Sequence, residues 1–559
     1  MKVPVISLNA KYVHLSPAPY ALGAGVLAFA RYPHEVIPLP RVVGKEREAL
    51  LATVVGMEPD AVALSVYIWN IEEIKRLLPR LRAALPSIPI ILGGPEVSYV
   101  VEKTLREMPE ADYVLSGEGE EPFARLLDVL AEGGDIASVP GCGYRTEDGV
   151  FVPAPFIGKG TPPSPLDFGY AEALHGRIAY LEGSRGCPFS CAFCLSGRAD
   201  GVRFFDIPRV KRDLLRLAEA DTRTVKLVDR TFNADRARAR ELWAFLLQKR
   251  QSGEIREDVC FHFEIAGELL DEETLALLST APKGLFQMEI GLQSFHAPTL
   301  RAIRRAPVSE RLCENISRLV QMGNIHVHID LIAGLPLEDH KSFREGFDRA
   351  FSLGAHMLQL GFLKLLHGAP LREEPEKYPC TYDECAPYTV RETPALPEAA
   401  LVDIALCEEG CERLYNSGKY RGTTRAAIAC GVSPYTLFRN AGARLNTLPQ
   451  GYTQDEEIAL LLAFFSDILT PARARDLLLL DFLSTNPSCY TPKALRVKNP
   501  LFSRVKRALD ARFPHTARRA LAFLYTENCI AYADYDRRDP ITGEYPVTRL
   551  EMKEFIAEL

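Results

Sequence analysis

The sequence lacks any apolar run long enough to cross a membrane. Its longest runs, such as Ile458–Phe465, are far shorter than the about 18 residues that a spanning helix requires. The N-terminus also lacks a basic region followed by a long apolar stretch and a small-residue cleavage site, so no signal peptide is predicted. We therefore expect a soluble cytoplasmic protein with no membrane partner.

A large excess of one charge is also absent. The 559 residues carry a net charge of −7, with 47% apolar and 25% charged residues. This balance gives no support for general nucleic-acid binding, and we interpret the basic stretch Arg504–Arg519 as a solvated helix face. At about 150 residues per domain, the length predicts three or four domains with sizeable cores.

The cysteines do not form a disulfide pattern. There are thirteen, an odd number spread widely over a large chain without an export signal, so most are expected to be buried thiols. Two pairs, Cys380 with Cys385 and Cys407 with Cys411, could hold an auxiliary cluster. Packing is the favoured interpretation, because residues 407 and 411 share one face of a predicted helix.

Short apolar runs and helical patterns alternate over residues 1–150. Strands are predicted at 3–8, 61–66, 88–92 and 113–116, and helices at 18–29, 71–85 and 122–130. This alternation predicts an α/β doubly wound, Rossmann-like domain with a parallel sheet. Such sheets bind ligands at the carboxyl ends of their strands, where this sequence places polar and Gly-rich segments.

Three further parts follow along the chain. Residues 151–174 are rich in Pro and Gly and are predicted to be a linker. Residues 175–370 contain six strand–helix units, which predict a partial or full (β/α) barrel with its chemistry at the carboxyl ends of the strands. The six strands are expected at 178–182, 224–228, 260–265, 285–290, 326–332 and 357–363. Residues 371–559 are predicted to form a mostly helical C-terminal region, with strands near 520–535, that closes a substrate pocket.

A tight group of cysteines directly follows the first strand of the predicted barrel. Cys187, Cys191 and Cys194 have the spacing Cys-x3-Cys-x2-Cys, and three thiolates this close can hold one [4Fe–4S] cluster. Because the cluster has four irons, one iron stays open to chelate a ligand. A zinc site and three buried thiols are the alternatives. A structural zinc would need a fourth ligand, and no Cys or His lies within ten residues on either side.

This segment resembles the radical S-adenosylmethionine (SAM) superfamily. The aromatic Phe193 before the third cysteine fits the family, as do the segments 228–233, 263–265, 289–294 and 330–336. The resemblance implies that SAM is contacted by a set of five residues: Phe193, Glu264, Gln293, Arg305 and Asp330. An Arg can pair a carboxylate, and Asp or Glu can hold hydroxyl or ammonium groups. The alternative is that Glu264 and Asp330 are ion-pair partners at strand ends.

The doubly wound domain before the barrel resembles the cobalamin-binding branch of this superfamily. The long C-terminal extension is similar to that of a bacterial subfamily with a C-terminal domain of unknown function. The resemblance implies cobalamin contacts from the strand-end loops: Asn9, Tyr12, His14, Ser65, Val66, Tyr67, Asn70, Gly93, Gly94, Pro95, Glu96, Val97, Gly117, Glu118, Gly119 and Glu120. No Asp-x-His-x-x-Gly motif occurs, so a histidine below the cobalt has no support in the sequence. A Rossmann-like module without a cofactor is the alternative.

Together these resemblances imply a cobalamin-dependent radical SAM enzyme that methylates an unactivated carbon or phosphorus centre. An electron donor of the flavodoxin or ferredoxin type is implied as a partner. Rearrangement or cyclisation, a cobalamin-free radical enzyme, and a cobalamin- or cluster-based sensor are the alternatives. A methylthiotransferase is disfavoured, because residues 1–150 contain only Cys142. No side chain is assigned as a proton donor, and the substrate stays open.

Overall fold

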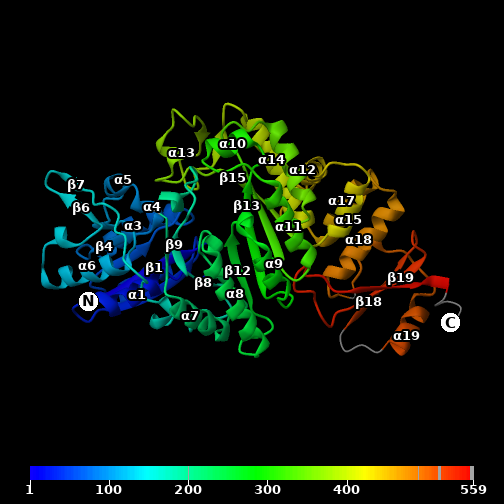
Figure 1. The fold of residues 1–559 in the computed structure, drawn as a ribbon, viewed down its shortest axis with the longest axis horizontal. Helices are drawn as coiled ribbons and strands as arrows, with labels where there is room; N and C mark the ends of the chain where they lie inside the picture. The colour runs from blue at the N-terminus through cyan, green and yellow to red at the C-terminus, as the bar shows by residue number, and fades with distance from the viewer. Residues whose placement is uncertain (199–200, 489, 514–517, 554–559) are drawn as a thin grey trace. The chain divides into compact units, whose positions relative to one another are not determined.

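The computed structural model describes residues 1–198, 201–488, 490–513 and 518–553 (Figure 1). The described chain separates into two compact units. The first comprises Met1–Met288, Arg301–Ala306 and Phe362–Arg391, and the second comprises Glu289–Leu300, Pro307–Gly361 and Glu392–Leu559.

A seven-stranded sheet forms the N-terminal part of the first unit. Its order is β2-β1-β3-β4-β5-β6-β7, and the first five strands in that order pair in parallel while β6 and β7 pair antiparallel. The strands are β1 (Lys2–Asn9), β2 (Glu35–Val42), β3 (Val62–Ser65), β4 (Ile90–Gly93), β5 (Tyr113–Leu115), β6 (Cys142–Thr146) and β7 (Gly149–Phe151). Nearly every residue of β1 is buried, as expected for a parallel strand covered on both faces.

Helices cover both faces of this sheet. One apolar core joins the sheet to α2 (Arg47–Gly56), α3 (Ile71–Ala84) and α5 (Val101–Glu107). A separate core joins it to α1 (Ala18–Phe29) and α6 (Glu120–Glu132). This is the predicted doubly wound arrangement. The edge strand β2 escaped prediction because Pro38 and Pro40 interrupt it, and proline is tolerated only at sheet edges.

A six-stranded sheet follows, in the order β15-β14-β13-β12-β11-β8. Its strands lie close to the six predicted ones: β8 (Ala179–Leu181), β11 (Thr224–Leu227), β12 (Cys260–Ile265), β13 (Phe286–Gln293), β14 (His326–Ala333) and β15 (Met357–Phe362). The open order, with β8 at one edge and β15 at the other, is that of a partial barrel. A two-stranded sheet of β9 (Ser184–Gly186) and β10 (Val202–Phe204) flanks the cysteine motif and was not predicted.

Helices alternate with these strands as the periodicity predicts. They are α7 (Ile207–Glu219), α8 (Arg236–Gln251), α9 (Glu272–Ser279), α10 (Ala297–Ala302), α11 (Glu310–Met322) and α12 (His340–Ser352). Several start with a side-chain cap: Asp206, Asp235, Asp271, Ser309 and Asp339 each accept a backbone N–H three residues on. Such caps satisfy free backbone N–H groups and set the starts of these helices locally.

The C-terminal region is mostly helical, as predicted. Its helices are α14 (Glu398–Cys411), α15 (Arg421–Ala429), α16 (Pro434–Leu445), α17 (Gln454–Ser466), α18 (Pro471–Thr485) and α19 (Phe502–Arg512). A three-stranded antiparallel sheet follows, built from β18 (Arg519–Leu524), β19 (Cys529–Asp534) and β20 (Val547–Glu551). Residues 514–517 of the basic stretch lie outside the described residues.

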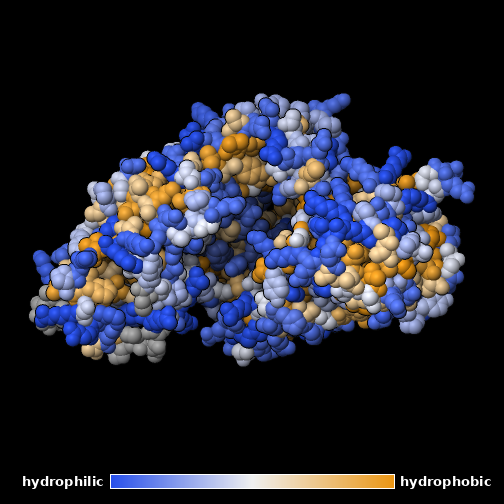
Figure 2. Space-filling view, turned by 180° about the vertical axis from the view of Figure 1, so that it is seen from behind, coloured by the Kyte–Doolittle hydropathy of each residue, from blue (hydrophilic) through white to orange (hydrophobic). Residues whose placement is uncertain are grey.

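In the described part of the chain, no helix is long and apolar enough to cross a membrane. On the face displayed in Figure 2, hydrophobic side chains lie in separate groups among hydrophilic ones.

Candidate functional site

The cysteine motif lies in the loop that leaves β9. Cys191 is buried, while Cys187 and Cys194 are half-buried, and none of the three is in a disulfide. Burial raises the pKa of the Cys191 thiol, and the Arg305 guanidinium, 3.7 Å from its Sγ, opposes that rise. Cys191 also interacts electrostatically with Cys187 and Cys194, so the three thiols form one group. Three free, clustered thiols are the donor set that an iron–sulfur cluster needs.

Backbone contacts fix the motif from two sides. The Ala192 N–H donates to the carbonyl of Ile303 at 3.0 Å, and the Leu371 N–H donates to the carbonyl of Ala192 at 2.9 Å. The first contact places Arg305, two residues beyond Ile303, beside Cys191. This explains how a residue more than 100 positions away reaches the cysteine loop.

Asp229 supports the start of the motif and was not assigned a role from the sequence. Its carboxylate accepts the Gly183 N–H at 2.7 Å and the Ser184 hydroxyl at 2.6 Å, and the group is fully enclosed. Burial raises the pKa of Asp229 to about 6, against the effect of both hydrogen bonds. Nearby, Thr231 Oγ1 lies 3.4 Å from Cys187 Sγ. The segment after β11 therefore braces the loop that carries the cysteines.

Three of the residues predicted to contact SAM lie in the first unit. Arg305 lies at Cys191, Phe193 is half-buried within the motif, and Glu264 lies on β12, 3.8 Å from Arg230. Of these, the structure brings Arg305 and Phe193 to the cysteine loop itself. The ion pair of Glu264 with Arg230 is the alternative role that the sequence left open. Because its 3.8 Å separation is longer than a hydrogen bond, this ion pair does not exclude a contact between Glu264 and a ligand.

The other two, Gln293 and Asp330, lie in the second unit. Gln293 ends β13 with a φ of 70°, and its buried Oε1 has no hydrogen-bond partner among the described residues. The adjacent Gly291 leaves room for the Gln293 amide, since a Cβ there would lie 2.2 Å from its Nε2. A non-glycine residue at positive φ is strained, and such strain often occurs at ligand sites. Asp330 lies on β14 beside His328 and Glu289, which the sequence analysis did not assign as site residues.

The loop after β1 contains the first residues predicted to contact cobalamin. Asn9 accepts the Ser16 N–H at 3.0 Å, so its side chain closes the loop. His14 Nδ1 lies 2.6 Å from the Tyr180 hydroxyl, and burial lowers the pKa of His14. Tyr12 is exposed, with the Arg177 guanidinium 4.5 Å from its ring centre. Of the three, Tyr12 is therefore the one that offers a free surface.

The loop after β3 is fixed by its own polar side chains. Asn70 accepts the Tyr67 N–H at 2.8 Å and donates to the carbonyls of Leu8 and Ser65. Tyr67 stacks on Trp69 with the ring centres 4.4 Å apart, and Trp69 is 47% exposed. Trp69 lies inside the loop predicted to contact cobalamin, between Tyr67 and Asn70, but was not named there individually.

The loop after β4 makes a close backbone contact. Gly94 has a φ of 121°, and a Cβ there would lie 2.4 Å from the carbonyl oxygen of Val66, so this position requires glycine. Pro95 starts the short helix α4 (Pro95–Ser98), and Val97 is buried in the core. Glu96 is also buried and accepts a hydrogen bond from the Tyr388 hydroxyl. Its carboxylate is therefore already engaged within the protein.

The loop after β5 is joined to the cysteine motif by ion pairs. The Arg185 guanidinium contacts Glu118 at 2.6 Å, Glu120 at 2.6 Å and Glu182 at 2.7 Å. Arg203 contacts Glu118 at 2.6 Å. Burial opposes ionisation of Glu120, yet Arg185 keeps its pKa below the usual value. Arg185 precedes Cys187 by only two residues, so this network links the two halves of the first unit.

The remaining cysteine pairs lie on other elements of the fold. Cys407 and Cys411 are buried on α14, where burial raises the pKa of both thiols well above the usual value, and Cys411 Sγ lies 3.7 Å from the carbonyl of Leu358. Cys380 is half-buried and Cys385 is exposed.

Three family models match this chain in succession. Residues 22–127 match the B12 binding domain, residues 181–350 match the radical SAM superfamily, and residues 376–518 match a protein family of unknown function, DUF4080. The chain therefore contains, in this order, regions that match a B12 binding domain, a radical SAM domain and a DUF4080 domain, as the sequence predicted.

Two known methyltransferases are similar in sequence to part of this chain, and one solved structure has a similar fold. The 2-(S-pantetheinyl)-carbapenam-3-carboxylate methyltransferase of Streptantibioticus cattleyicolor is 28% identical over 57% of this chain and 49% of its own length. The cobalamin-dependent radical SAM methyltransferase TokK of Streptomyces tokunonensis is likewise 28% identical over 57% of this chain and 49% of its own. The chain thus spans about half the length of these relatives. The solved structure of OxsB, a cobalamin-dependent SAM radical enzyme, shares the fold with a TM-score of 0.58, 14% identity, and coverage of 92% of this chain and 80% of OxsB.

Proposed function

We propose that this protein is a cobalamin-dependent radical SAM enzyme that methylates an unactivated carbon or phosphorus centre. The observation that carries the proposal is the composition of the first unit. A B12-binding sheet and a loop with three free cysteines belong to one compact body, and Arg185 joins the strand-end loop of the sheet to the cysteine loop. The relatives named above, two of them methyltransferases, support methylation over rearrangement.

The cysteine loop fits a [4Fe–4S] cluster by its donor set. Cys187, Cys191 and Cys194 would hold three irons and leave the fourth open for the amino and carboxylate groups of SAM. Arg305 places a positive charge beside Cys191, where it would offset the charge of a thiolate-bound cluster and pair a carboxylate. Glu264, Gln293 and Asp330 would contact the remaining polar groups of SAM.

The strand-end loops would hold cobalamin from one edge of the sheet. Tyr12 and Trp69 provide exposed aromatic surfaces there, and Gly94 lets two loops approach closely. When bound, the cluster with SAM supplies a 5′-deoxyadenosyl radical after one-electron reduction, and cobalamin supplies the methyl group. The residues of the chain orient these groups and exclude water from them. A reductant of the flavodoxin or ferredoxin type and a cytoplasmic location belong to this proposal.

The test is anaerobic purification with cobalamin supplied, followed by iron and cobalt analysis and an assay with SAM and a reductant. We expect about four irons and about one cobalt per chain, and release of 5′-deoxyadenosine. Cys187→Ala should abolish both iron binding and SAM cleavage. The matched control is Cys385→Ala, an exposed cysteine outside the motif, which should retain both.

Different failures would contradict different parts of the proposal. A cluster without cobalt would exclude the cobalamin methylase and leave a radical SAM enzyme. Iron binding that survives Cys187→Ala would exclude the assigned cluster site. Loss of iron in Cys385→Ala would indicate that Cys385 is a ligand of an auxiliary cluster.

A further inference from the structure

Polar side chains share one face of β13 and β14. Along β13 the residues alternate strictly between buried and half-buried, and Glu289 and Gln293 are on the half-buried face. Along β14, His326, His328 and Asp330 share one face, because successive strand residues point to opposite sides. These two neighbouring strands of the sheet therefore carry a row of polar side chains.

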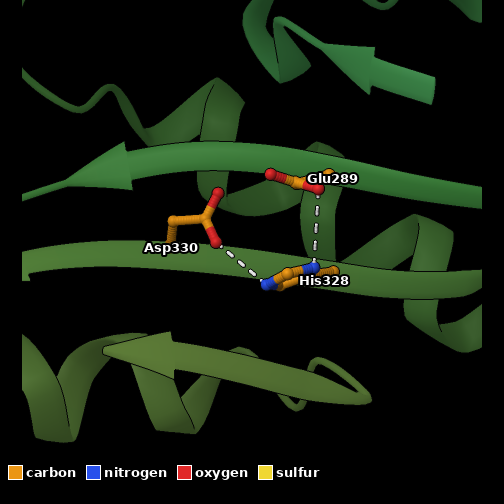
Figure 3. A group of neighbouring side chains, drawn as sticks. All are labelled: Glu289, His328 and Asp330. Atoms are coloured by element: carbon orange, nitrogen blue, oxygen red, sulfur yellow. Dashed lines mark ion pairs between the residues drawn. The ribbon is translucent and has the colours of Figure 1, made fainter. Parts of the chain in front are cut away.

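Three of these side chains meet. The carboxylates of Glu289 and Asp330 and the His328 ring offer atoms that all lie within 4.8 Å of one another (Figure 3). His328 forms an ion pair with each carboxylate: its Nε2 lies 2.9 Å from Asp330 Oδ1, and its Nδ1 lies 3.8 Å from a Glu289 oxygen. The 2.9 Å contact does not have the geometry of a hydrogen bond. Figure 3 shows one Asp330 oxygen directed at His328 and the other directed away from it. The side chains keep some accessibility: 11% for His328, 20% for Glu289 and 17% for Asp330.

We infer that His328 is a positioning residue that holds the Asp330 carboxylate in the orientation needed to accept hydroxyl groups of the SAM ribose, and that Glu289 in turn orients the His328 ring. This inference rests on the proposed function, in which Asp330 contacts SAM. Neither His328 nor Glu289 is assigned a contact with SAM itself.

The physical reason is the freedom of an aspartate side chain. A carboxylate on a strand can rotate about its terminal bond, and a close ion-pair contact to one oxygen favours one rotation, which leaves the second oxygen in a defined direction. An imidazole placed between two carboxylates has its own orientation fixed, as in the carboxylate–histidine pairs that orient ligands at metal and catalytic sites. The 3.8 Å contact exceeds a hydrogen bond, so Glu289 acts on His328 mainly by charge attraction.

The net charge of the group formed by Glu289, His328 and Asp330 determines which kind of ligand it can bind. Two carboxylates with one imidazole are net negative whether or not the imidazole is protonated. The cluster therefore favours hydrogen-bond donors such as ribose hydroxyls and repels phosphate or carboxylate groups. A divalent cation is the other ligand that two carboxylates and a histidine could hold, and the experiment below separates the two.

The test compares four variants by equilibrium binding without turnover. His328→Phe keeps the ring volume and removes both nitrogens, whereas His328→Gln keeps one donor for Asp330. Asp330→Asn tests the contact with SAM itself. His326→Phe is the matched control, because it is the same change on the same face of the same strand, at a ring that packs beside His356. Binding of SAM is measured on the oxidised, cluster-loaded chain, and binding of 5′-deoxyadenosine on cluster-free protein by calorimetry.

We expect His328→Phe to weaken binding of both ligands about tenfold, as is typical when a group that orients a ligand-binding residue is removed. His328→Gln should recover much of that loss, and His326→Phe should bind like the wild type. In the SAM cleavage assay, His328→Phe should raise KM with little change in kcat. This pattern is expected when the bound substrate and the transition state lose the same amount of binding energy. A purely structural role would instead lower the melting temperature in both phenylalanine variants without separating their affinities.

Three results would overturn the inference. One is His328→Phe with wild-type affinity in a protein where Asp330→Asn binds weakly. Another is equal loss in His328→Phe and His326→Phe. The third is stoichiometric Mn²⁺ binding, seen by electron paramagnetic resonance and lost in His328→Gln, which would assign the cluster to a metal ion. A wild-type chain that binds neither a cluster nor SAM would contradict the proposed function itself, which is a distinguishable outcome.

Discussion

At the scale of single residues, a few buried carboxyl groups determine the shape of the strand-end loops. Asp229 holds the start of the cysteine motif, and Glu338 links the loops that follow β13 and β14. Glu338 Oε1 accepts the Ser294 hydroxyl at 2.6 Å, directly after Gln293, and the residue is only 2% exposed. The position of Gln293 therefore depends on the hydrogen bond that its neighbour Ser294 donates to a carboxyl group in the loop after β14.

The Glu338 carboxyl predicts a pH dependence of stability. Burial raises its pKa from 4.5 to about 7, so the folded protein keeps this proton over a range in which the unfolded chain has released it. The folded state then binds more protons, and the free energy of unfolding falls as the pH rises from 4.5 to 7, by up to about 3 kcal/mol. Glu338→Gln removes this titration.

The measurement is the melting temperature of both proteins across pH 4.5 to 8. We expect the wild type to lose stability relative to Glu338→Gln as the pH rises through this window. Parallel profiles for the two proteins would show that the carboxyl group titrates normally.

At the scale of elements, one guanidinium joins the B12-binding sheet to the strand before the cysteines. Arg185, on β9, contacts Glu118 and Glu120 at the start of α6 as well as its neighbour Glu182. Glu120 is buried, so its charge depends on Arg185. Breaking a buried pair from one side costs far more than the pair contributes, because an uncompensated charge is left behind.

Arg185→Met is expected to destabilise the first unit by about 3–5 kcal/mol, the usual cost of an orphaned buried carboxylate. The matched control is Arg125→Met, which breaks an exposed pair with Glu121 on the same helix and should cost less than about 1 kcal/mol. Thermal unfolding of the full chain measures both.

A double variant tests the cause of that loss. Adding Glu120→Gln to Arg185→Met should restore part of the stability, because it removes the unpaired charge. Equal losses in Arg185→Met and Arg125→Met would show that the network contributes no more than a surface ion pair.

At the scale of the whole molecule, the two cofactors of the proposed function are held by different structural elements. The cobalamin loops follow the strands of the first sheet, whereas the cysteines follow β9. Each binding surface has local contacts of its own, and the Arg185 network connects the two through Glu118 and Glu120 in the loop after β5.

We therefore expect the two cofactors to be lost independently. Cys187→Ala should lose iron and retain cobalt at the wild-type level. Gly94→Val should do the reverse, because its side chain would collide with the Val66 carbonyl and displace two cobalamin loops. Iron and cobalt analysis of both variants, purified in the same way, is the measurement. Joint loss of both metals in either variant would show that the sites are assembled as one.

Much of the fold followed from local patterns in the sequence. The strands at β12, β13 and β14 and the helices α1, α3 and α6 lie within a few residues of their predicted positions, because apolar periodicity acts over a few positions. The helices α15 and α16 and the hairpin of β9 and β10 were missed. The sequence patterns of these elements are short, and their structure depends on contacts with residues far away in the chain. Gly442 of α16, for example, packs against the carbonyl of Leu406 in α14.

The sequence by itself determined the order of the domains, the cysteine motif and the class of chemistry, because each is encoded in residues close together in the chain. Only the tertiary structure decided which distant side chains meet. It placed Arg305 at Cys191, Arg185 at Glu120, and His328 between Glu289 and Asp330. Spacing along the chain cannot predict such pairs, because they depend on how strands register and how loops close over tens to hundreds of residues.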